Sequence, residues 1–231
     1  MKTYRSPTEG PIIGQIPNQE IRSLYHEWLR DHVKDCVNKS STLPIECVNI
    51  FQNMVSGRIV SFAKGFSKLI WRTMPTQFLG CTEYVYQAWV HGFFSTASQF
   101  ASPTWVVEVE QCFGIGRLDL RLLSDDEAII HEYKRINLKK KDKESGYGDS
   151  QRKWLSKAAE KGLRQIKVKG YRARLPDQVT HLREFGIAFL GPYCAIMGHS
   201  LEREPGEQWR ILKLYTAERN ERHRNRLYNA S

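Results

Sequence analysis

Cysteines are few in this chain, and their distribution excludes one class of fold. The five cysteines of the 231-residue sequence are odd in number and widely scattered, without a C-x-x-C pair or zinc-ligand spacing. The chain is also too long, and at 41% hydrophobic residues too apolar, for a small disulfide scaffold or a disordered protein. We therefore expect an intracellular protein, cytoplasmic or nuclear, with its own hydrophobic core.

Long apolar runs and nucleotide-binding motifs are also missing. Residues 1–16 lack the apolar core of a signal peptide, and no stretch approaches the roughly 20 apolar residues that span a bilayer. No G-x-x-x-x-G-K-[ST] motif occurs, and Gly114-Ile115-Gly116 lacks the third glycine of a dinucleotide site. The sequence thus predicts no membrane partner and excludes hydrolysis of a nucleotide by a P-loop.

Positive charge is abundant, and one segment holds all of its excess. The formal net charge is +10, but residues 133–174 contain 15 basic and 4 acidic residues, so the remainder of the chain is close to neutral. Such a segment suits a polyanionic partner. The alternative at this point is a solvated, lysine-rich helix and loop.

Hydrophobic periodicity divides the chain into three parts. Residues 1–80 are predicted to be helical after a flexible lead-in over 1–16, with an amphipathic helix over 19–35 and two more before Pro75. Residues 81–218 alternate helices (82–100, 152–168) with β-like runs (104–112, 117–123, 128–135, 185–190, 193–197, 209–215). Residues 219–231 form a basic tail. The order predicts an α/β fold with a mixed central sheet flanked by helices.

Two β-like runs that follow each other in the sequence carry residues able to bind a metal ion or take part in catalysis. Alternation along 117–122 places the three leucines Leu118, Leu120 and Leu122 on one face of the strand and Asp119 on the other. The same period of two places Glu132 and Lys134 side by side on one face of the next strand. Two carboxylates can bind Mg²⁺ together with waters and a substrate phosphate, and a lysine can polarise the attacking water. The alternative is that all three residues lie on the solvated face of an ordinary strand.

A set of motifs in order resembles the PD-(D/E)XK nuclease superfamily, in the branch where this domain follows an AAA-ATPase-like module. The motifs are Gly116-Arg117-Leu118-Asp119, Glu132-Tyr133-Lys134, Gly162-Leu163-Arg164-Gln165-Ile166 and Gly170-Tyr171, with Glu83-x-x-Tyr86 before them and Gly186-Ile187-Ala188-Phe189 after them. The similarity covers roughly 82–198 and, more loosely, 16–35. It implies a restriction-endonuclease-like core.

The resemblance also implies roles for individual residues. Asp119, Glu132 and the backbone carbonyl of Tyr133 would bind the metal, Lys134 would be the catalytic lysine, and Glu83 would complete or tune the metal site. Gln165 would approach the active site from its helix, or lie on the helix surface. Tyr171 would support the site, although ordinary core packing is its simpler role, and His131 is expected to point into the core.

Together these observations predict a Mg²⁺- or Mn²⁺-dependent nuclease that acts on DNA in preference to RNA. The alternative is a catalytically inactive module of the same fold that binds nucleic acid or a protein, and the oligomeric state is left open. Basic residues beside the site would contact the phosphate backbone, namely Lys139, Lys140, Lys141, Lys143, Arg152, Lys153, Lys157, Lys161 and Arg164.

Overall fold

The computed structural model describes most of the chain between residues 43 and 218. The described residues are 3–4, 13–14, 31, 35, 43–74, 83–99, 104–109, 112–113, 116–137, 148–191, 193–204 and 208–218. The predicted helix over 19–35 lies outside them except for Asp31 and Asp35, which are helical. Lys139, Lys140, Lys141 and Lys143 and the predicted basic tail also lie outside the described residues.

A six-stranded mixed sheet forms the centre of the molecule, in the order β10-β9-β8-β7-β6-β3. Neighbouring strands are antiparallel except for β7 and β8, which are parallel because α6 connects them as a crossover. The prediction of a mixed sheet is therefore confirmed. The strands are β3 (Val106–Val109), β6 (Leu120–Leu123), β7 (Glu127–Arg135), β8 (His181–Leu190), β9 (Tyr193–Arg203) and β10 (Trp209–Glu218).

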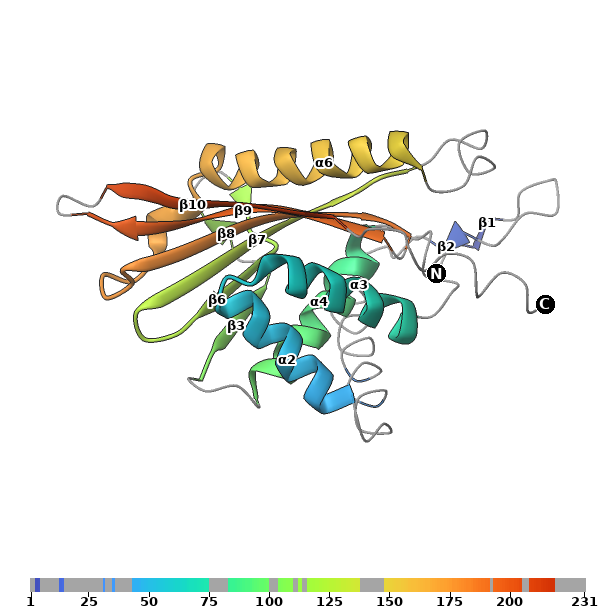
Figure 1. Cartoon of the computed structure of the whole chain (residues 1–231), viewed down its shortest axis with the longest axis horizontal. Coiled ribbons are helices and arrows are strands. Elements are labelled where there is room, and N and C mark those ends of the chain that lie inside the picture. Colours follow the sequence, from blue (N-terminus) through green and yellow to red (C-terminus); the bar gives the residue numbers. More distant parts are fainter. Residues whose placement is uncertain are drawn as a thin grey trace.

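Helices cover both faces of this sheet (Figure 1). On one face α6 (Asp149–Val168) packs against β7, β8 and β9. On the other face lie α2 (Leu43–Val55), α3 (Ile59–Thr73) and α4 (Glu83–Ser98). Helix α6 begins three residues before its predicted start, because the Gln151 side chain accepts a hydrogen bond from the Gly148 N–H at 3.0 Å and extends the first turn.

The three helices α2, α3 and α4 share one hydrophobic core with the sheet. Phe66 of α3 lies at its centre, with its ring centroid 5.7 Å from that of Trp89 on α4 and 6.4 Å from that of Phe189 on β8. Within the described residues, the region before residue 80 therefore packs directly on the sheet. A second core between α6 and the sheet contains Leu118, Ile130, Ile166 and Tyr171.

Helix α6 approaches the sheet unusually closely where glycines face each other. A Cβ atom added to Gly186 of β8 would lie 1.9 Å from the carbonyl oxygen of Ala159, and one added to Gly162 of α6 would lie 3.1 Å from the carbonyl oxygen of Glu132. Gly186 therefore leaves no room for a side chain, and a Cβ at Gly162 would make a tighter contact than is usual. This contact fixes the middle of α6 above β7 and β8.

The predicted strand over 117–123 is interrupted, and this corrects one expectation. Gly116–Arg117 forms β5, which pairs with β4 (Cys112–Phe113) in a separate sheet, while β6 begins at Leu120. Leu118 packs in the core beneath α6, whereas Leu120 and Leu122 pack in the core of α2, α3 and α4. The leucines do not share a face because the chain bends at Asp119, so the alternation of a strand does not continue through it.

Two further features complete the described structure. Thr3–Tyr4 (β1) and Ile13–Gly14 (β2) form a short antiparallel ribbon. Among the helices that the structure describes, none has both the length and the apolar composition that crossing a bilayer requires.

Candidate active site

The register between β6 and β7 brings the two predicted carboxylates together. Leu120 pairs with His131, so Asp119, at the bend that precedes β6, lies opposite the next residue of β7, Glu132. The Lys134 side chain faces α6, since its Cγ atom would lie 3.6 Å from a Cβ added to Gly162, and Glu132, two residues earlier on β7, shares that face. The expected convergence of two carboxylates and a lysine is therefore present in the fold.

Hydrogen bonds fix the orientation of these side chains. Asp119 Oδ2 accepts a bond from the Tyr133 N–H at 2.7 Å, and Asp119 Oδ1 accepts one from Gln87 Nε2 at 2.8 Å. Lys134 Nζ donates to Glu132 Oε1 at 2.7 Å and to the Tyr133 carbonyl oxygen at 2.8 Å. The ammonium group thus lies against two of the oxygen atoms that were predicted to bind a metal.

Burial and mutual repulsion make both carboxyl groups harder to ionise. Burial, followed by the negative charge of Glu132, raises the pKa of Asp119 to about 8, although the Tyr133 N–H and Lys134 partly oppose the shift. Burial also raises the pKa of Glu132, against the attraction of Lys134. Two carboxylates in such a site repel each other unless a cation lies nearby.

The residues present suit a hard divalent cation. Glu132 is 2% exposed, and its Oε2 atom is buried without a hydrogen-bond partner among the described residues. No group of three His, Cys, Asp or Glu side chains that could hold a metal occurs in the described part of the chain. The protein would therefore offer two carboxylates and the Tyr133 carbonyl, a set to which Mg²⁺ adds waters and substrate oxygens.

Glu83 lies at the start of α4, beside the end of β7. Its Oε2 atom accepts a hydrogen bond from the Arg135 N–H at 3.2 Å. Its charge contributes to the raised pKa values of Asp119 and Glu132, after burial and closer groups. The predicted metal role of Glu83 stays a prediction, and its position favours tuning of the site by charge.

Gln165 and Tyr171 connect α6 to the segment that carries Asp119. Tyr171 begins the short 3₁₀-helix η2 (Tyr171–Arg174), and its hydroxyl donates to the Arg117 carbonyl oxygen at 2.6 Å. Burial raises the pKa of Tyr171, and a hydrogen bond with Gln165 opposes this shift. Since the Tyr171 ring is also fully buried, the residue packs in the core while its hydroxyl supports the strand that ends two residues before Asp119.

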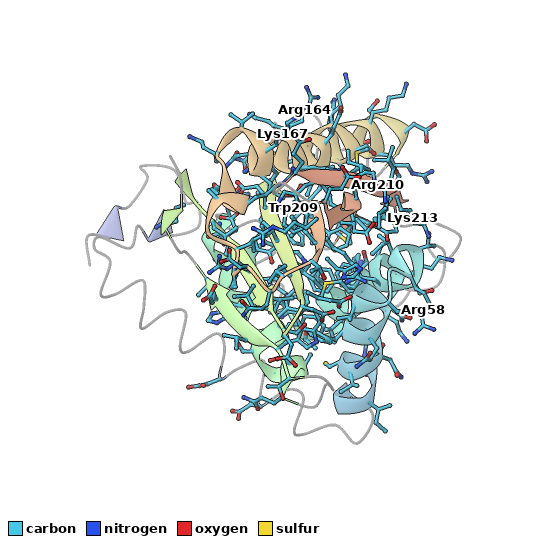
Figure 2. The ribbon with its side chains drawn as sticks, turned by 90° about the vertical axis from the view of Figure 1, so that its left-hand side faces the viewer. Arg58, Arg164, Lys167, Trp209, Arg210 and Lys213 are labelled. Atoms are coloured by element: carbon cyan, nitrogen blue, oxygen red, sulfur yellow. The ribbon has the colours of Figure 1, made fainter. Side chains whose placement is uncertain are left out.

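The predicted nucleic-acid contacts within the described residues lie on α6. Lys153, Lys157, Lys161 and Arg164 are exposed, whereas Arg152 is half-buried, with Nη1 3.8 Å from Asp149. Figure 2 shows Arg164 on α6 together with Lys167. Trp154, on the same helix, is 38% exposed.

Sequence reasoning missed two sets of contacts. Gln87 donates a hydrogen bond to Asp119, and the available signal was a polar residue one helical turn after Glu83, among the apolar residues of the N-terminal half of α4. Arg172, which belongs to the basic segment 133–174, donates to both oxygens of Glu184, at 2.5 and 2.7 Å. His199 has its Nε2 atom 2.7 Å from Glu184 Oε2. These contacts join residues too distant in sequence for a local pattern to reveal.

His131 lies on the opposite face of β7, as expected. It is fully buried, its Nδ1 atom lies 3.0 Å from the Tyr133 hydroxyl, and its ring packs edge-on against Phe94. Burial lowers the pKa of His131 to about 3. The residue is therefore a neutral core histidine that contacts the aromatic side chains between the sheet and α4.

Comparison with known proteins agrees with this geometry. No curated protein matches the chain, and no solved structure matches it. A family model of the PD-(D/E)XK nuclease superfamily matches residues 82–198, just over half of the chain, and the match includes Asp119, Glu132 and Lys134. With its mixed sheet, flanking helices and this match, the chain has a restriction-endonuclease-like fold and belongs to the PD-(D/E)XK nuclease superfamily.

Proposed function

We propose that this protein is a Mg²⁺- or Mn²⁺-dependent nuclease that hydrolyses phosphodiester bonds, with DNA as its substrate in preference to RNA. The observation that carries the proposal is the pair of carboxyl groups, the half-buried Asp119 and the buried Glu132, with Lys134 Nζ 2.7 Å from Glu132. A pair buried only for stability would leave Glu132 Oε2 without a compensating partner among the described residues, which is costly. A cation removes that cost.

The metal site would consist of Asp119, Glu132 and the carbonyl oxygen of Tyr133. A divalent cation held there would supply charge neutralisation at the phosphate and would lower the pKa of a water molecule. The chain itself supplies the orientation, because Asp119 is held at both carboxylate oxygens and Tyr133 belongs to a central strand. Groups that are fixed before the substrate arrives need no costly rearrangement during the reaction.

Lys134 would donate hydrogen bonds to the attacking water or to a phosphate oxygen. Its Nζ atom lies between the carbonyl of Tyr133 and the carboxylate of Glu132, so it adjoins the site that the phosphate would enter. Gln165 would act beside it through its hydrogen bond with Tyr171. The exposed cations of α6 would hold the phosphate backbone without reading its sequence.

The test is cleavage of supercoiled plasmid DNA by the full chain with Mg²⁺, with Mn²⁺ and with EDTA. We expect nicking with either metal ion, loss of nicking in EDTA, and no activity in the variants Asp119→Ala, Glu132→Ala and Lys134→Ala. Glu202→Ala on β9 is the control, because it removes an exposed carboxylate outside the site. A labelled RNA of matched length tests the preference for DNA.

Two outcomes would contradict the proposal. Equal cleavage by the wild type and all three site variants would indicate a contaminating nuclease. Retardation of DNA by the wild type without cleavage under any metal condition would instead support the alternative, a catalytically inactive module that binds nucleic acid.

A further inference from the structure

Gln87 is a buried polar residue in the largely apolar N-terminal half of α4, and it belongs to none of the sequence motifs. It lies on α4, one turn after Glu83, with apolar residues on both sides in sequence, and it is 8% exposed. Its Oε1 atom is buried without a hydrogen-bond partner among the described residues. Burial of an amide with one group unsatisfied costs free energy, so a purely structural role would favour an apolar residue here.

The contact that Gln87 does make is with the proposed metal ligand. Its Nε2 atom donates to Asp119 Oδ1 at 2.8 Å, while the Tyr133 N–H donates to Asp119 Oδ2 at 2.7 Å. Asp119 itself lies at the bend between β5 and β6, so its backbone is outside both ladders. Its side chain therefore depends on these two donors for its orientation, one from β7 and one from α4.

Two donors on different oxygens determine the plane of the carboxylate. With only the Tyr133 bond, the group could rotate about its Cβ–Cγ bond, and the lone pairs left for a cation would point in varying directions. The Gln87 bond removes this rotation. Partners of this kind around metal ligands typically change metal affinity or activity by about 10- to 100-fold when they are removed.

We propose that Gln87 is a positioning residue, which holds the carboxylate of Asp119 in the orientation that binds the divalent cation. This inference rests on the proposed function, since it presumes that Asp119 is a metal ligand. The amide is suited to the task because it donates a hydrogen bond without adding charge to a site that already contains two carboxyl groups. A glutamate at this position would repel Asp119 and could donate only when protonated.

The experiment measures Mn²⁺ binding by isothermal titration calorimetry in the full chain carrying Gln87→Met. Methionine keeps the length and unbranched shape of the side chain and removes the donor. We expect Mn²⁺ affinity to fall about 10- to 100-fold, with cleavage reduced at limiting Mn²⁺ and partly restored when Mn²⁺ is raised. Gln87→Leu is the second variant, and the thermal midpoint of each protein is measured alongside.

Gln99→Met is the matched control, because Gln99 is exposed just beyond the end of the same helix and receives the same chemical change. It should bind Mn²⁺ as the wild type does. Unchanged Mn²⁺ affinity in folded Gln87→Met, with only a lower thermal midpoint, would assign Gln87 a purely structural role and overturn the inference.

The same measurements separate this inference from the proposed function. If the wild type binds Mn²⁺, Gln87→Met binds it more weakly, and no protein cleaves DNA or RNA, the nuclease proposal fails while the role of Gln87 holds. If the wild type does not bind Mn²⁺ at all, both proposals fail.

Discussion

Lys134 would have different roles in the metal-free and the metal-bound site. Its ammonium group donates to Glu132 Oε1 and to the Tyr133 carbonyl, both of which are proposed metal ligands. Without a metal it thus balances part of the charge of the carboxyl pair. With a cation held by these oxygen atoms, Lys134 would be free to donate hydrogen bonds to the attacking water or the phosphate.

Lys134→Met separates the two roles. We expect cleavage to be abolished, because the donor to water and phosphate is lost, and Mn²⁺ affinity to be equal to that of the wild type or higher, because a competing positive charge is removed. Calorimetry with Mn²⁺ and plasmid cleavage measure the two effects. Affinity reduced several-fold would indicate instead that Lys134 supports the metal ligands.

Among the residues that the structure describes, Glu184 is the most deeply buried carboxylate outside the site. It is fully buried on β8 between Arg172, which binds both of its oxygens, and His199 of β9. Burial alone would raise its pKa, but the hydrogen bonds from Arg172 and His199 outweigh burial, and the pKa of Glu184 is lowered. The carboxylate is therefore more strongly favoured in the folded chain than in the unfolded chain.

The resulting pH dependence has a definite sign. A lowered pKa in the folded state stabilises the protein above the ordinary glutamate pKa of about 4.3, and the stabilisation is lost as the pH falls below it. We expect Glu184→Gln to lower the free energy of unfolding by about 3–5 kcal/mol at pH 7, since it leaves Arg172 without its partner. The difference from the wild type should shrink toward pH 3.

Urea unfolding at pH 7 and pH 3.5 measures this effect. Glu202→Gln is the control on the same sheet, because its ion pair with Arg210 is exposed on both sides and contributes at most about 1 kcal/mol. A Glu184→Gln deficit that stays constant between the two pH values would show that lost packing, rather than lost charge, causes the destabilisation.

At the scale of the elements, α6 connects the proposed catalytic residues with the exposed cations that are proposed to bind DNA. Its inner side contacts β8 at Gly186, where no side chain fits, and the same segment adjoins the backbone of Glu132. We expect Gly186→Ala to push α6 from the sheet and to lower the free energy of unfolding by about 1–3 kcal/mol or more. Cleavage should fall further than stability alone explains, because Glu132 and Lys134 lie beneath this contact.

Chemical denaturation and cleavage assays measure both effects. Gly148→Ala is the control at the start of the same helix, since an added Cβ there lies 3.6 Å from its nearest neighbour. Similar losses in the two alanine variants would point to backbone flexibility rather than to the close contact at Gly186.

The outer side of α6 carries exposed cations. We expect Lys157→Gln combined with Lys161→Gln to weaken DNA binding and to reduce the slope of log affinity against log salt by up to about 2, if each residue contacts a phosphate. Lys64→Gln with Lys68→Gln is the control, because both are exposed on α3, across the sheet from α6. Fluorescence anisotropy over a series of salt concentrations measures the slopes. Equal slopes in both double variants would indicate that the cations of α6 do not contact DNA.

At the scale of the whole molecule, the helices before residue 80 and the sheet share one core. Phe66 of α3 packs against rings of α4 and of β8. We expect Phe66→Ala to lower the free energy of unfolding by about 3–5 kcal/mol and to shift a single cooperative transition.

Thermal unfolding followed by circular dichroism and by tryptophan fluorescence provides the measurement. Val60→Ala is the control on the same helix, because Val60 is exposed. Two separate transitions, of which Phe66→Ala shifts only one, would show that the N-terminal helices unfold independently of the sheet.

Elements whose formation depends on local sequence patterns could be predicted, and elements that depend on distant contacts could not. Helices α2, α3 and α4 were predicted because the spacing of their buried residues alone identifies them. Strand β8 was predicted from residue 185 but begins at His181, because charged residues such as Glu184 obscure the apolar pattern. Only the distant partners of Glu184 make its burial favourable.

The residues of the candidate site could be named from the sequence, whereas most of the contacts between them could not be predicted. The spacing of Glu132 and Lys134 placed them on one face, as observed. The bend at Asp119, by contrast, broke the alternation on which the prediction of three leucines on one face depended. The contact between Gln87 and Asp119 spans 32 residues and two elements, so periodicity carries no information about it.

The low cysteine content, the absence of long apolar runs and the excess of charge over residues 133–174 are properties of composition, so the sequence alone determined them. The sequence also determined the family, because the order and spacing of the motifs can be read without a structure. Tertiary structure decided which of the basic residues are exposed on α6 and which, like Arg172, are bound to a buried carboxylate. The physical reason is that charge is additive along a chain, whereas burial and pairing depend on which distant segments meet.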